Sequence, residues 1–309
     1  MSVSVVGHSN PDTDSVTAAI AYANYMKATG TDAVACMQIS ADKLNPESKV
    51  VLNKFNLTAP QQISDVAGKD IALVDFSDIA QAPANIGDAN IVAIVDHHKI
   101  GDITTGSPIF FYAKPVGCTC TVLLEMYKNN NVELPKNIAG GMLCAILSDT
   151  VNFKSPTCTD EDKAAVADLL KIAGVSDQDA LFMEMLKAKS SVAGVPIKDL
   201  VFRDYKDFDM NGKKVGIGQI ELATLDQVAD IRNDLYKAIQ DVKAEGRHSV
   251  LFMLTDVVKE GTDLMVVSDE PGIIEGAFKG KLEGQSMWVA GMMSRKKQTV
   301  PPLQKAFGA

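Results

Sequence analysis

Histidine and aspartate side chains stand directly after apolar segments in the first half of this sequence. The apolar run Val3–Gly7 leads into a polar stretch that begins with a histidine and contains two aspartates. Two further runs, Ile71–Val74 and Ile91–Val95, end in an aspartate and in an Asp-His-His triplet, and a helix-like segment, Ile138–Ser148, also ends in an aspartate. The candidate site residues are His8, Asp12, Asp14, Asp75, His97, His98 and Asp149.

These side chains would need a counter-charge if the fold brought them together. Several carboxylates within a few ångström repel one another and raise one another's pKa values, and divalent cations remove that repulsion. A mixture of imidazole and carboxylate ligands suits Mn, Co, Zn or Fe better than Mg or Ca, which prefer oxygen alone. Because the candidates outnumber the ligands of one tetrahedral ion, we expect two metals, roughly 4 Å apart, a device for in-line displacement at phosphorus.

Each residue taken alone also has a purely structural explanation. Asp12 and Asp14 are typical of a helix N-terminus before a helix that starts near Ser15. Asp75 and Asp149, each taken alone, are explained as ordinary acidic residues of loops. The combination favours a metal site, because three of the four histidines follow predicted strands, each beside an aspartate.

Alternating strand-like and helix-like stretches must position these residues. Continuous apolar runs predict strands that are buried on both faces, and helix formers between them predict helices, such as Ser15–Thr29. This alternation predicts an α/β fold whose N-terminal domain has a doubly wound, mainly parallel sheet with helices on both faces. Sites in such sheets form at the carboxyl ends of the strands, where most of the candidates stand.

A small, polar stretch divides the sequence and precedes Pro196. Its composition predicts a linker at 189–195, between an N-terminal metal-binding domain at 1–188 and a smaller C-terminal α/β substrate-binding domain at 196–309. The C-terminal domain is predicted to contain strands at Lys214–Ile220, Ser249–Leu254, Asp263–Ser268 and Ser286–Ala290 and a long helix at Leu225–Ala244.

The composition argues against several classes of protein. The 309 residues carry a formal net charge of −9, which argues against nucleic-acid binding. No apolar run is long enough to span a membrane, and the N-terminus lacks the pattern of a signal peptide, so we expect a cytoplasmic protein. The five cysteines lack metal-binding spacing, and we expect them to be reduced.

Seven short motifs, spread over nearly the whole chain, resemble one enzyme family. They are GHSNPDTDS at Gly7–Ser15, VD at Val74–Asp75, VDHH at Val95–His98, PVGCT at Pro115–Thr119, ILSD at Ile146–Asp149, FKSPTCTD at Phe153–Asp160 and SRKKQ at Ser294–Gln298. Together they resemble the family II, manganese-dependent inorganic pyrophosphatases of the DHH phosphoesterase superfamily. The resemblance implies hydrolysis of pyrophosphate to two phosphates with two or more Mn²⁺ ions per subunit, for which Co²⁺ or Mg²⁺ can substitute.

The resemblance also implies a role for each candidate residue. One metal would be held by His8, Asp12 and Asp75, and a second by Asp14, Asp75, His97 and Asp149. Asp75 would therefore be shared, and a water or hydroxide that bridges the two metals would be the nucleophile. His98 would contact the substrate and act on the leaving phosphate.

Basic residues of the C-terminal domain complete the implied site. Lys206, Arg295 and Lys296 match the family's pyrophosphate-binding residues. The two domains would close over the substrate, and the N-terminal domain would form a homodimer. One departure stands beside the shared aspartate: many members have His-Asn there, whereas this chain has Phe76-Ser77.

Other reactions within the same superfamily remain as alternatives. These are an exopolyphosphatase, which acts on longer phosphate chains, and a phosphodiesterase, which acts on short oligonucleotides. A regulator that binds metal without turnover is a further alternative from a different class. The phosphodiesterase branch usually has a glycine-rich motif with a histidine in its second domain, whereas SRKKQ stands in this chain.

Overall fold

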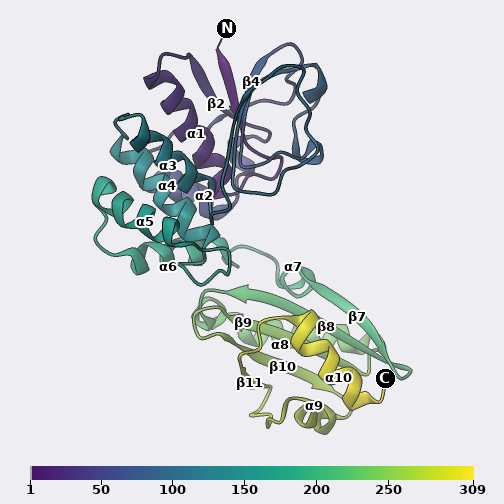
Figure 1. The fold of residues 1–309 in the computed structure, drawn as a ribbon. Helices are drawn as coiled ribbons and strands as arrows, with labels where there is room; N and C mark the ends of the chain where they lie inside the picture. The colour runs from purple at the N-terminus through teal and green to yellow at the C-terminus, as the bar shows by residue number, and fades with distance from the viewer. Residues whose placement is uncertain (1) are drawn as a thin grey trace. The chain divides into compact units, whose positions relative to one another are not determined.

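The computed structural model describes residues 2–309 and divides them into two compact units (Figure 1). The first ends at Lys189, and the second runs from Ser190 to Ala309. Met1, the first residue of the predicted domain 1–188, lies outside the described residues. The domain ranges 1–188 and 196–309 and the linker at 189–195 stay predictions.

A six-stranded parallel sheet forms the centre of the first unit, with strand order β3-β2-β1-β4-β5-β6. Its strands are β1 Val3–Val6, β2 Ala33–Met37, β3 Gln61–Gln62, β4 Asp70–Val74, β5 Asn90–Asp96 and β6 Phe110–Ala113. The helices are α1 Thr13–Ala28, α2 Pro46–Lys54, α3 Thr119–Asn129, α4 Lys136–Asp149, α5 Asp160–Ala173 and α6 Gln178–Lys189, with 3₁₀ turns η1 Ala41–Lys43, η2 Ile79–Gln81 and η3 Ile86–Asp88.

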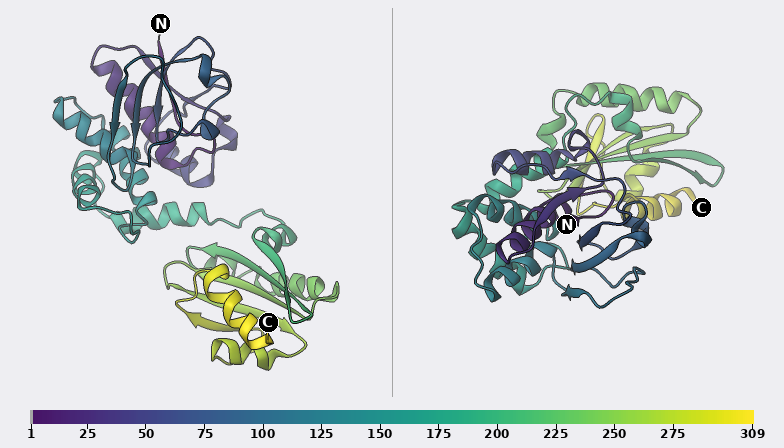
Figure 2. Two further views of the ribbon diagram at one scale, coloured as in Figure 1. Left: turned by 45° about the vertical axis from the view of Figure 1, so that its right-hand side comes forward. Right: turned by 90° about the horizontal axis from the view of Figure 1, so that it is seen from above.

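The strands of this sheet are buried on both faces, as their continuous apolar runs predicted. In β4, Ala72 and Val74 pack against the cluster that contains α1, α3 and α4. The alternate residues, Ile71 and Leu73, pack in a second cluster under the loops and 3₁₀ turns on the opposite face. Figures 1 and 2 show the α-helices on one side of the strands and these loops on the other. The predicted α/β class with a mainly parallel sheet is confirmed. The expectation of helices on both faces is wrong for α-helices, because the connections at 75–89 and 97–109 form loops and short 3₁₀ turns and cover the second face without an α-helix.

The second unit contains a mixed five-stranded sheet, with strand order β11-β10-β9-β8-β7. Only β8 and β9 pair in parallel among its described strands. The strands are β7 Tyr205–Met210, β8 Lys213–Leu222, β9 Ser249–Asp256, β10 Gly261–Ser268 and β11 Ser286–Ala290. The helices are α7 Ile197–Phe202, α8 Arg232–Ala244, α9 Pro271–Phe278 and α10 Val300–Phe307, with a 3₁₀ turn η4 Leu225–Val228 and a π-helical turn η5 Arg295–Thr299. Helices α7 and α8 pack on one face of the sheet, and α9 and α10 pack on the other.

One predicted helix of the second unit is interrupted. The stretch Leu225–Ala244 was expected to be continuous, but η4 ends at Val228 and α8 begins at Arg232. The side chain of Gln227 accepts a hydrogen bond from the Ala223 amide at 2.7 Å and takes part in a capping box at the start of η4.

None of the helices within residues 2–309 is both long enough and apolar enough to cross a membrane.

Candidate metal centre

The carboxyl ends of three neighbouring strands bring the first-unit candidates together. His8 follows β1, Asp75 follows β4, and His97 follows β5, in the strand order β1-β4-β5. The start of α1 adds Asp12 and Asp14, and the last residue of α4 adds Asp149. A cavity of about 210 Å³ is lined by His8, Asp12, Asp75, Gln81, His97, His98, Gly117, Asp149 and Thr157.

Asp75 lies at the centre of this cavity wall and is 2% exposed. Its Oδ2 lies 3.3 Å from Nε2 of His8, and its Oδ1 lies 3.5 Å from Nε2 of His97. The hydroxyl of Thr119 donates a hydrogen bond to Oδ1 at 3.0 Å. Each carboxylate oxygen of Asp75 thus faces a different imidazole, the arrangement needed for a ligand shared by two ions.

The backbone at Asp75 is left-handed, with a φ of 69°. Aspartate and asparagine tolerate this conformation better than most residues, because a short polar side chain can satisfy the local backbone. The turn ends β4 abruptly and sends the next side chain, Phe76, into the apolar cluster on the opposite face. Ser77 then accepts a hydrogen bond from the Gly101 amide at 2.9 Å, so this pair anchors the loop after His98.

Asp12 caps a helix and also lies among the candidate metal ligands. Its Oδ1 accepts a hydrogen bond from the Ser15 amide at 2.9 Å and caps α1. The same oxygen lies 3.6 Å from Nε2 of His8. Capping therefore holds the carboxylate at the cavity.

Asp14 is buried deeper, against the start of α3. Its two oxygens accept hydrogen bonds from the amides of Thr119 at 2.7 Å and Cys120 at 3.1 Å. Asp14, His97 and Asp149 form one group whose ligand atoms are close enough to share an ion, and His8, Asp12 and Asp75 form another. Thr119, in the first turn of α3, donates hydrogen bonds to Asp14 of one group and to Asp75 of the other.

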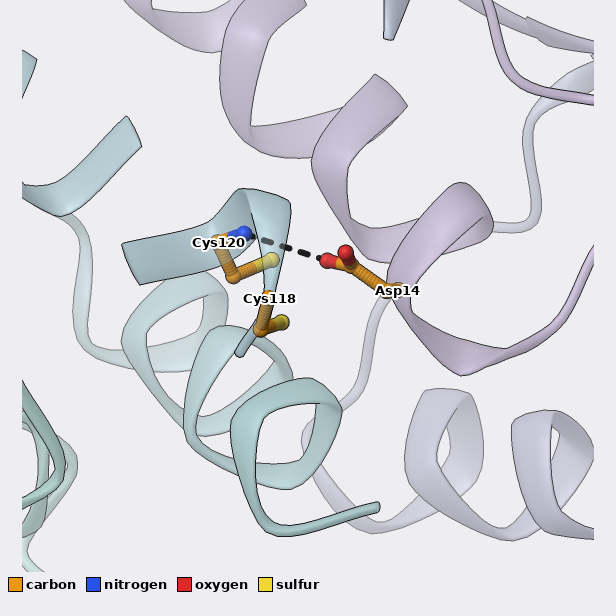
Figure 3. Close-up of side chains that lie close together, drawn as sticks. All are labelled: Asp14, Cys118 and Cys120. Carbon is orange, nitrogen blue, oxygen red and sulfur yellow. Dashed lines mark hydrogen bonds between the residues drawn. The ribbon is translucent and has the colours of Figure 1, made fainter. Parts of the chain in front are cut away.

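The thiols of Cys118 and Cys120 lie beside Asp14 on the side of α3 (Figure 3). Burial raises the pKa of both thiols well above the usual value. A thiol that stays protonated is a poor metal ligand, so the imidazoles and carboxylates are the stronger candidates. All five cysteines are free in the structure, in agreement with the expectation of reduced thiols.

His98 differs from His97 in its surroundings. The Nδ1 atom of His97 lies 3.0 Å from the Val116 carbonyl, which turns its Nε2 towards Asp75. His98 has a side chain that is 52% exposed, and its Nδ1 lies 2.9 Å from Oδ1 of Asp96. That hydrogen bond raises the pKa of His98. His98 therefore lines the cavity as a half-exposed side chain, with one ring nitrogen held by Asp96.

The crowding of charges at the cavity shifts the pKa values of the candidate ligands. Burial lowers the pKa of His8, but its hydrogen bonds to Asp12 and Asp75 outweigh that effect and raise the pKa to about 10. His97 follows the same pattern, through Asp75 and Asp14, and its pKa is also raised to about 10. Burial, followed by the charge of Asp75, raises the pKa of Asp14 to about 7. The carboxylates need a positive counter-charge, and a mixture of carboxylate oxygens and imidazole nitrogens fits Mn²⁺ or a similar divalent ion.

The three basic candidates belong to the second unit. Lys206 lies on β7 and is exposed, and Lys296 is exposed in η5. The guanidinium of Arg295 lies 2.6 Å from the Asp204 carboxylate and also donates to the Ile217 carbonyl at 3.3 Å. These contacts hold Arg295 beside the segment that leads into Lys206.

Besides Gly117, which lines the cavity from a loop, four residues of the site were missed by the sequence reasoning. Asp96 is the first residue of the Asp-His-His triplet, and its Oδ1 also accepts hydrogen bonds from the amides of His97 and His98. Thr119 stands within a recognised motif and links two candidate ligands. Gln81 and Thr157 line the cavity from a 3₁₀ turn and a loop. The motifs contained Asp96, Thr119 and Thr157, but Gln81 had no signal in the sequence.

Comparison with protein-family models matches both parts of the chain. Residues 2–146 match the model of the DHH family N-terminal domain, and residues 183–306 match the model of the DHHA2 domain.

Similar proteins align over nearly their full length. A protein of Archaeoglobus fulgidus, assigned as a manganese-dependent inorganic pyrophosphatase, is 50% identical over 316 residues, which cover 99% of this chain and 98% of that one. The manganese-dependent inorganic pyrophosphatase of Methanothrix thermoacetophila is 46% identical over 306 residues, with coverage of 98% and 97%. A crystal structure from Methanococcus jannaschii, assigned to the family II inorganic pyrophosphatases, is 42% identical and covers 99% of both chains with a TM-score of 0.61.

Proposed function

This chain belongs to the family II, manganese-dependent inorganic pyrophosphatases of the DHH superfamily, and from that premise we propose that it hydrolyses pyrophosphate to two phosphates at a site with two metals. The observation that carries the proposal is the Asp75 carboxylate, whose two oxygens face His8 and His97. Relatives with the same assigned activity that align over 97–98% of their length support the reaction.

Two sets of side chains would hold the ions. We assign His8, Asp12 and Asp75 to the first, and Asp14, Asp75, His97 and Asp149 to the second. The grouping of His8 with Asp12 and Asp75, and of Asp14 with His97 and Asp149, supports this division. When bound, Mn²⁺ supplies Lewis acidity that lowers the pKa of water and neutralises phosphate charge.

His98 and the basic residues would act on the substrate. Pyrophosphate has no apolar surface, so cationic side chains must recognise it beside the metals. We assign that role to Lys206, Arg295 and Lys296, with the planar guanidinium of Arg295 able to bind two oxygens at once. His98 would donate a proton from its ring to the departing phosphate, with Asp96 holding the ring through Nδ1. Since these residues come from both units, the proposal includes closure of the units over the substrate.

Phosphate release decides between this function and its alternatives. The purified protein would be assayed with pyrophosphate, tripolyphosphate and a dinucleotide, each with Mn²⁺ and with a chelator. We expect rapid release from pyrophosphate that depends on Mn²⁺ and much slower release from the other two substrates. Preference for tripolyphosphate would indicate an exopolyphosphatase, and preference for the dinucleotide a phosphodiesterase. Binding of Mn²⁺ without turnover of any substrate would indicate a regulator.

Metal binding is expected to release protons. With pKa values of about 10, His8 and His97 carry protons at pH 7, and each must lose its proton to bind a cation. The apparent affinity for Mn²⁺ should therefore rise as the pH increases from 6 to 8, with roughly two or more protons released per chain at pH 7. Calorimetric titration in buffers with different ionisation enthalpies measures this number. Binding without proton release at pH 7 would contradict the assignment of both histidines as ligands.

We further propose that the first unit forms a homodimer through β6. This strand is at the edge of the sheet, and its Phe110 and Phe111 are 49% and 44% exposed. An edge strand has unpaired backbone groups, and exposed aromatic rings add apolar area, which suits pairing with a second copy.

Disruption of β6 is expected to give monomers. Phe110→Lys combined with Phe111→Lys adds two charges that cannot be buried against a second copy, so light scattering after gel filtration should show half the wild-type mass. The control is Trp288→Lys, which changes an exposed aromatic residue on β11, the edge strand of the second sheet. A dimer that persists in the double variant would contradict this interface.

A further inference from the structure

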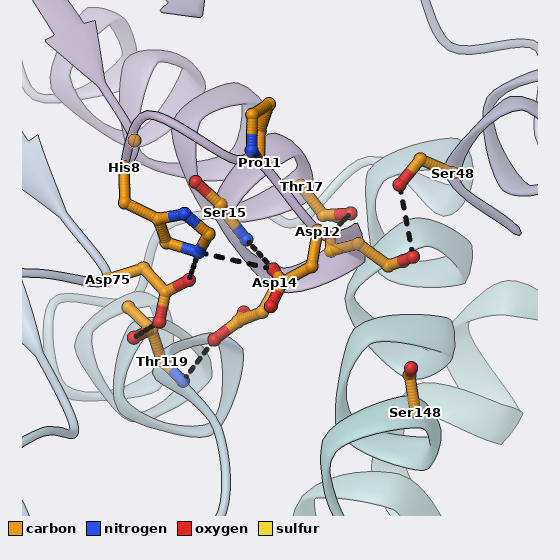
Figure 4. A network of polar contacts seen from close by, with 12 residues as sticks. His8, Pro11, Asp12, Asp14, Ser15, Thr17, Ser48, Asp75, Thr119 and Ser148 are labelled. Atoms are coloured by element: carbon orange, nitrogen blue, oxygen red, sulfur yellow. Dashed lines mark hydrogen bonds and ion pairs between the residues drawn. The ribbon is translucent and has the colours of Figure 1, made fainter. Parts of the chain in front are cut away.

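Asn45, which caps the start of α2, holds the loop that contains the first candidate ligands. The side-chain amide of Asn45 donates to the Pro11 carbonyl at 3.3 Å. The second residue of α2 is Glu47, which is 4% exposed although it carries a carboxylate. Figure 4 shows Pro11, Ser48 and Ser148 around this region, next to His8, Asp12 and Asp14.

One oxygen of Glu47 joins two segments that carry candidate metal ligands. The Thr13 hydroxyl donates to Oε1 at 2.6 Å, and the Ser148 hydroxyl donates to the same atom at 2.7 Å. Thr13 lies between Asp12 and Asp14, and Ser148 directly precedes Asp149. A change at Glu47 would therefore alter the spacing between the start of α1 and the end of α4, which supply opposite sides of one ligand set.

The second oxygen of Glu47 faces the end of the first unit. Nζ of Lys189 lies 3.6 Å from Oε2 and 3.4 Å from Oγ of Ser148. Lys189 is the last residue of α6 and of the first unit. A buried carboxylate is costly unless hydrogen bonds and a cation compensate its charge, and here two hydroxyls and an ammonium group do so.

We propose that Glu47 is a positioning residue for the metal centre, one that sets the separation of Asp14 from Asp149 through Thr13 and Ser148. This inference rests on the proposed function, because it takes Asp14 and Asp149 as ligands of one ion. Glu47 is absent from the described lining of the cavity, so it acts through its neighbours rather than on the substrate. Residues that orient metal ligands in this way typically change metal affinity by about 10- to 100-fold when they are replaced.

The test is a calorimetric Mn²⁺ titration of the full chain with Glu47→Ala, with thermal unfolding measured in parallel on the metal-free protein. We expect the ion held by Asp14 and Asp149 to bind about 10- to 100-fold more weakly, and the ion at His8 to change less. Phosphate release should fall at limiting Mn²⁺ and recover at high Mn²⁺. The matched control is Glu184→Ala, which removes an exposed glutamate that pairs with Lys54 across α2 and α6 at 2.8 Å. Its Mn²⁺ affinity should equal that of the wild type.

Two milder variants keep the proposal open to test if Glu47→Ala fails to fold. Ser148→Ala removes one arm of the contact and should weaken Mn²⁺ binding about fivefold, the loss expected for one hydrogen bond. Glu47→Gln keeps an oxygen that can accept from both hydroxyls and should stay closer to the wild type. Unchanged Mn²⁺ affinity in Ser148→Ala, or in a folded Glu47→Ala, would overturn the proposal. A wild-type protein that binds no Mn²⁺ or releases no phosphate would instead overturn the proposed function.

Discussion

Asp75→Asn is expected to lower the rate of phosphate release from pyrophosphate by about 1,000-fold or more while leaving the fold intact. Both proposed ion sites use this carboxylate, and an uncharged amide cannot replace it in both. Asparagine suits the test because it tolerates the left-handed backbone at this position, where φ is 69°. Asp75→Ala should lose at least as much activity, with an added cost in stability from the backbone. Steady-state rates at saturating Mn²⁺ measure the loss, and circular dichroism checks the fold.

A second acid in the same loop gives the control for Asp75. Asp78 is half-buried, lies outside the described cavity lining and caps no helix through its side chain. Asp78→Asn should retain wild-type activity and Mn²⁺ binding. Turnover close to the wild type in Asp75→Asn at saturating Mn²⁺ would contradict the assignment of two metals that share one carboxylate.

Substitution His98→Gln is expected to reduce kcat by about 100- to 10,000-fold, the range for loss of a general acid. Glutamine keeps polar contacts but cannot transfer a proton. Because His98 is half-exposed and lies outside both proposed ligand sets, Mn²⁺ affinity should stay close to the wild-type value. Rates and calorimetric titrations of the same preparation separate the two effects.

His248 provides a matched histidine outside the metal centre. Its ring contacts Ser249 at 2.8 Å and Glu270 at 3.0 Å in the second unit. His248→Gln should leave kcat unchanged. If His98→Gln lost Mn²⁺ binding together with kcat, His98 would be a ligand, and its role as an acid would be wrong.

The pH dependence of the rate of phosphate release gives a further test of the proposed role of His98. Its hydrogen bond to Asp96 raises its pKa, so the protonated ring persists further towards alkaline pH than that of an unperturbed histidine. The alkaline limb of the rate should therefore depend on Asp96. Asp96→Asn should move that limb to lower pH, because the neutral amide stabilises the protonated ring less than the carboxylate does.

The fold class and most first-unit site candidates could be predicted from the sequence because they depend on short-range patterns. Apolar runs such as Ile71–Val74 predict strands buried on both faces, and parallel strands place their carboxyl ends at one edge of a sheet. That geometry alone brings His8, Asp75 and His97 together. The spacing of apolar residues did not reveal that Leu225–Ala244 is interrupted between Val228 and Arg232.

The residue types around the cavity were determined by the sequence, but their contacts were decided by the tertiary structure. Glu47 has no distinguishing local pattern, and its partners Thr13 and Ser148 stand 34 and 101 residues away. Hydrogen bonds over such separations form after helices pack, and a single sequence carries no record of which side chains then meet. The same reason explains Gln81, which reaches the cavity from the 3₁₀ turn η2. Strand-end chemistry was therefore predictable, whereas the buried contacts that hold it in place required the folded chain.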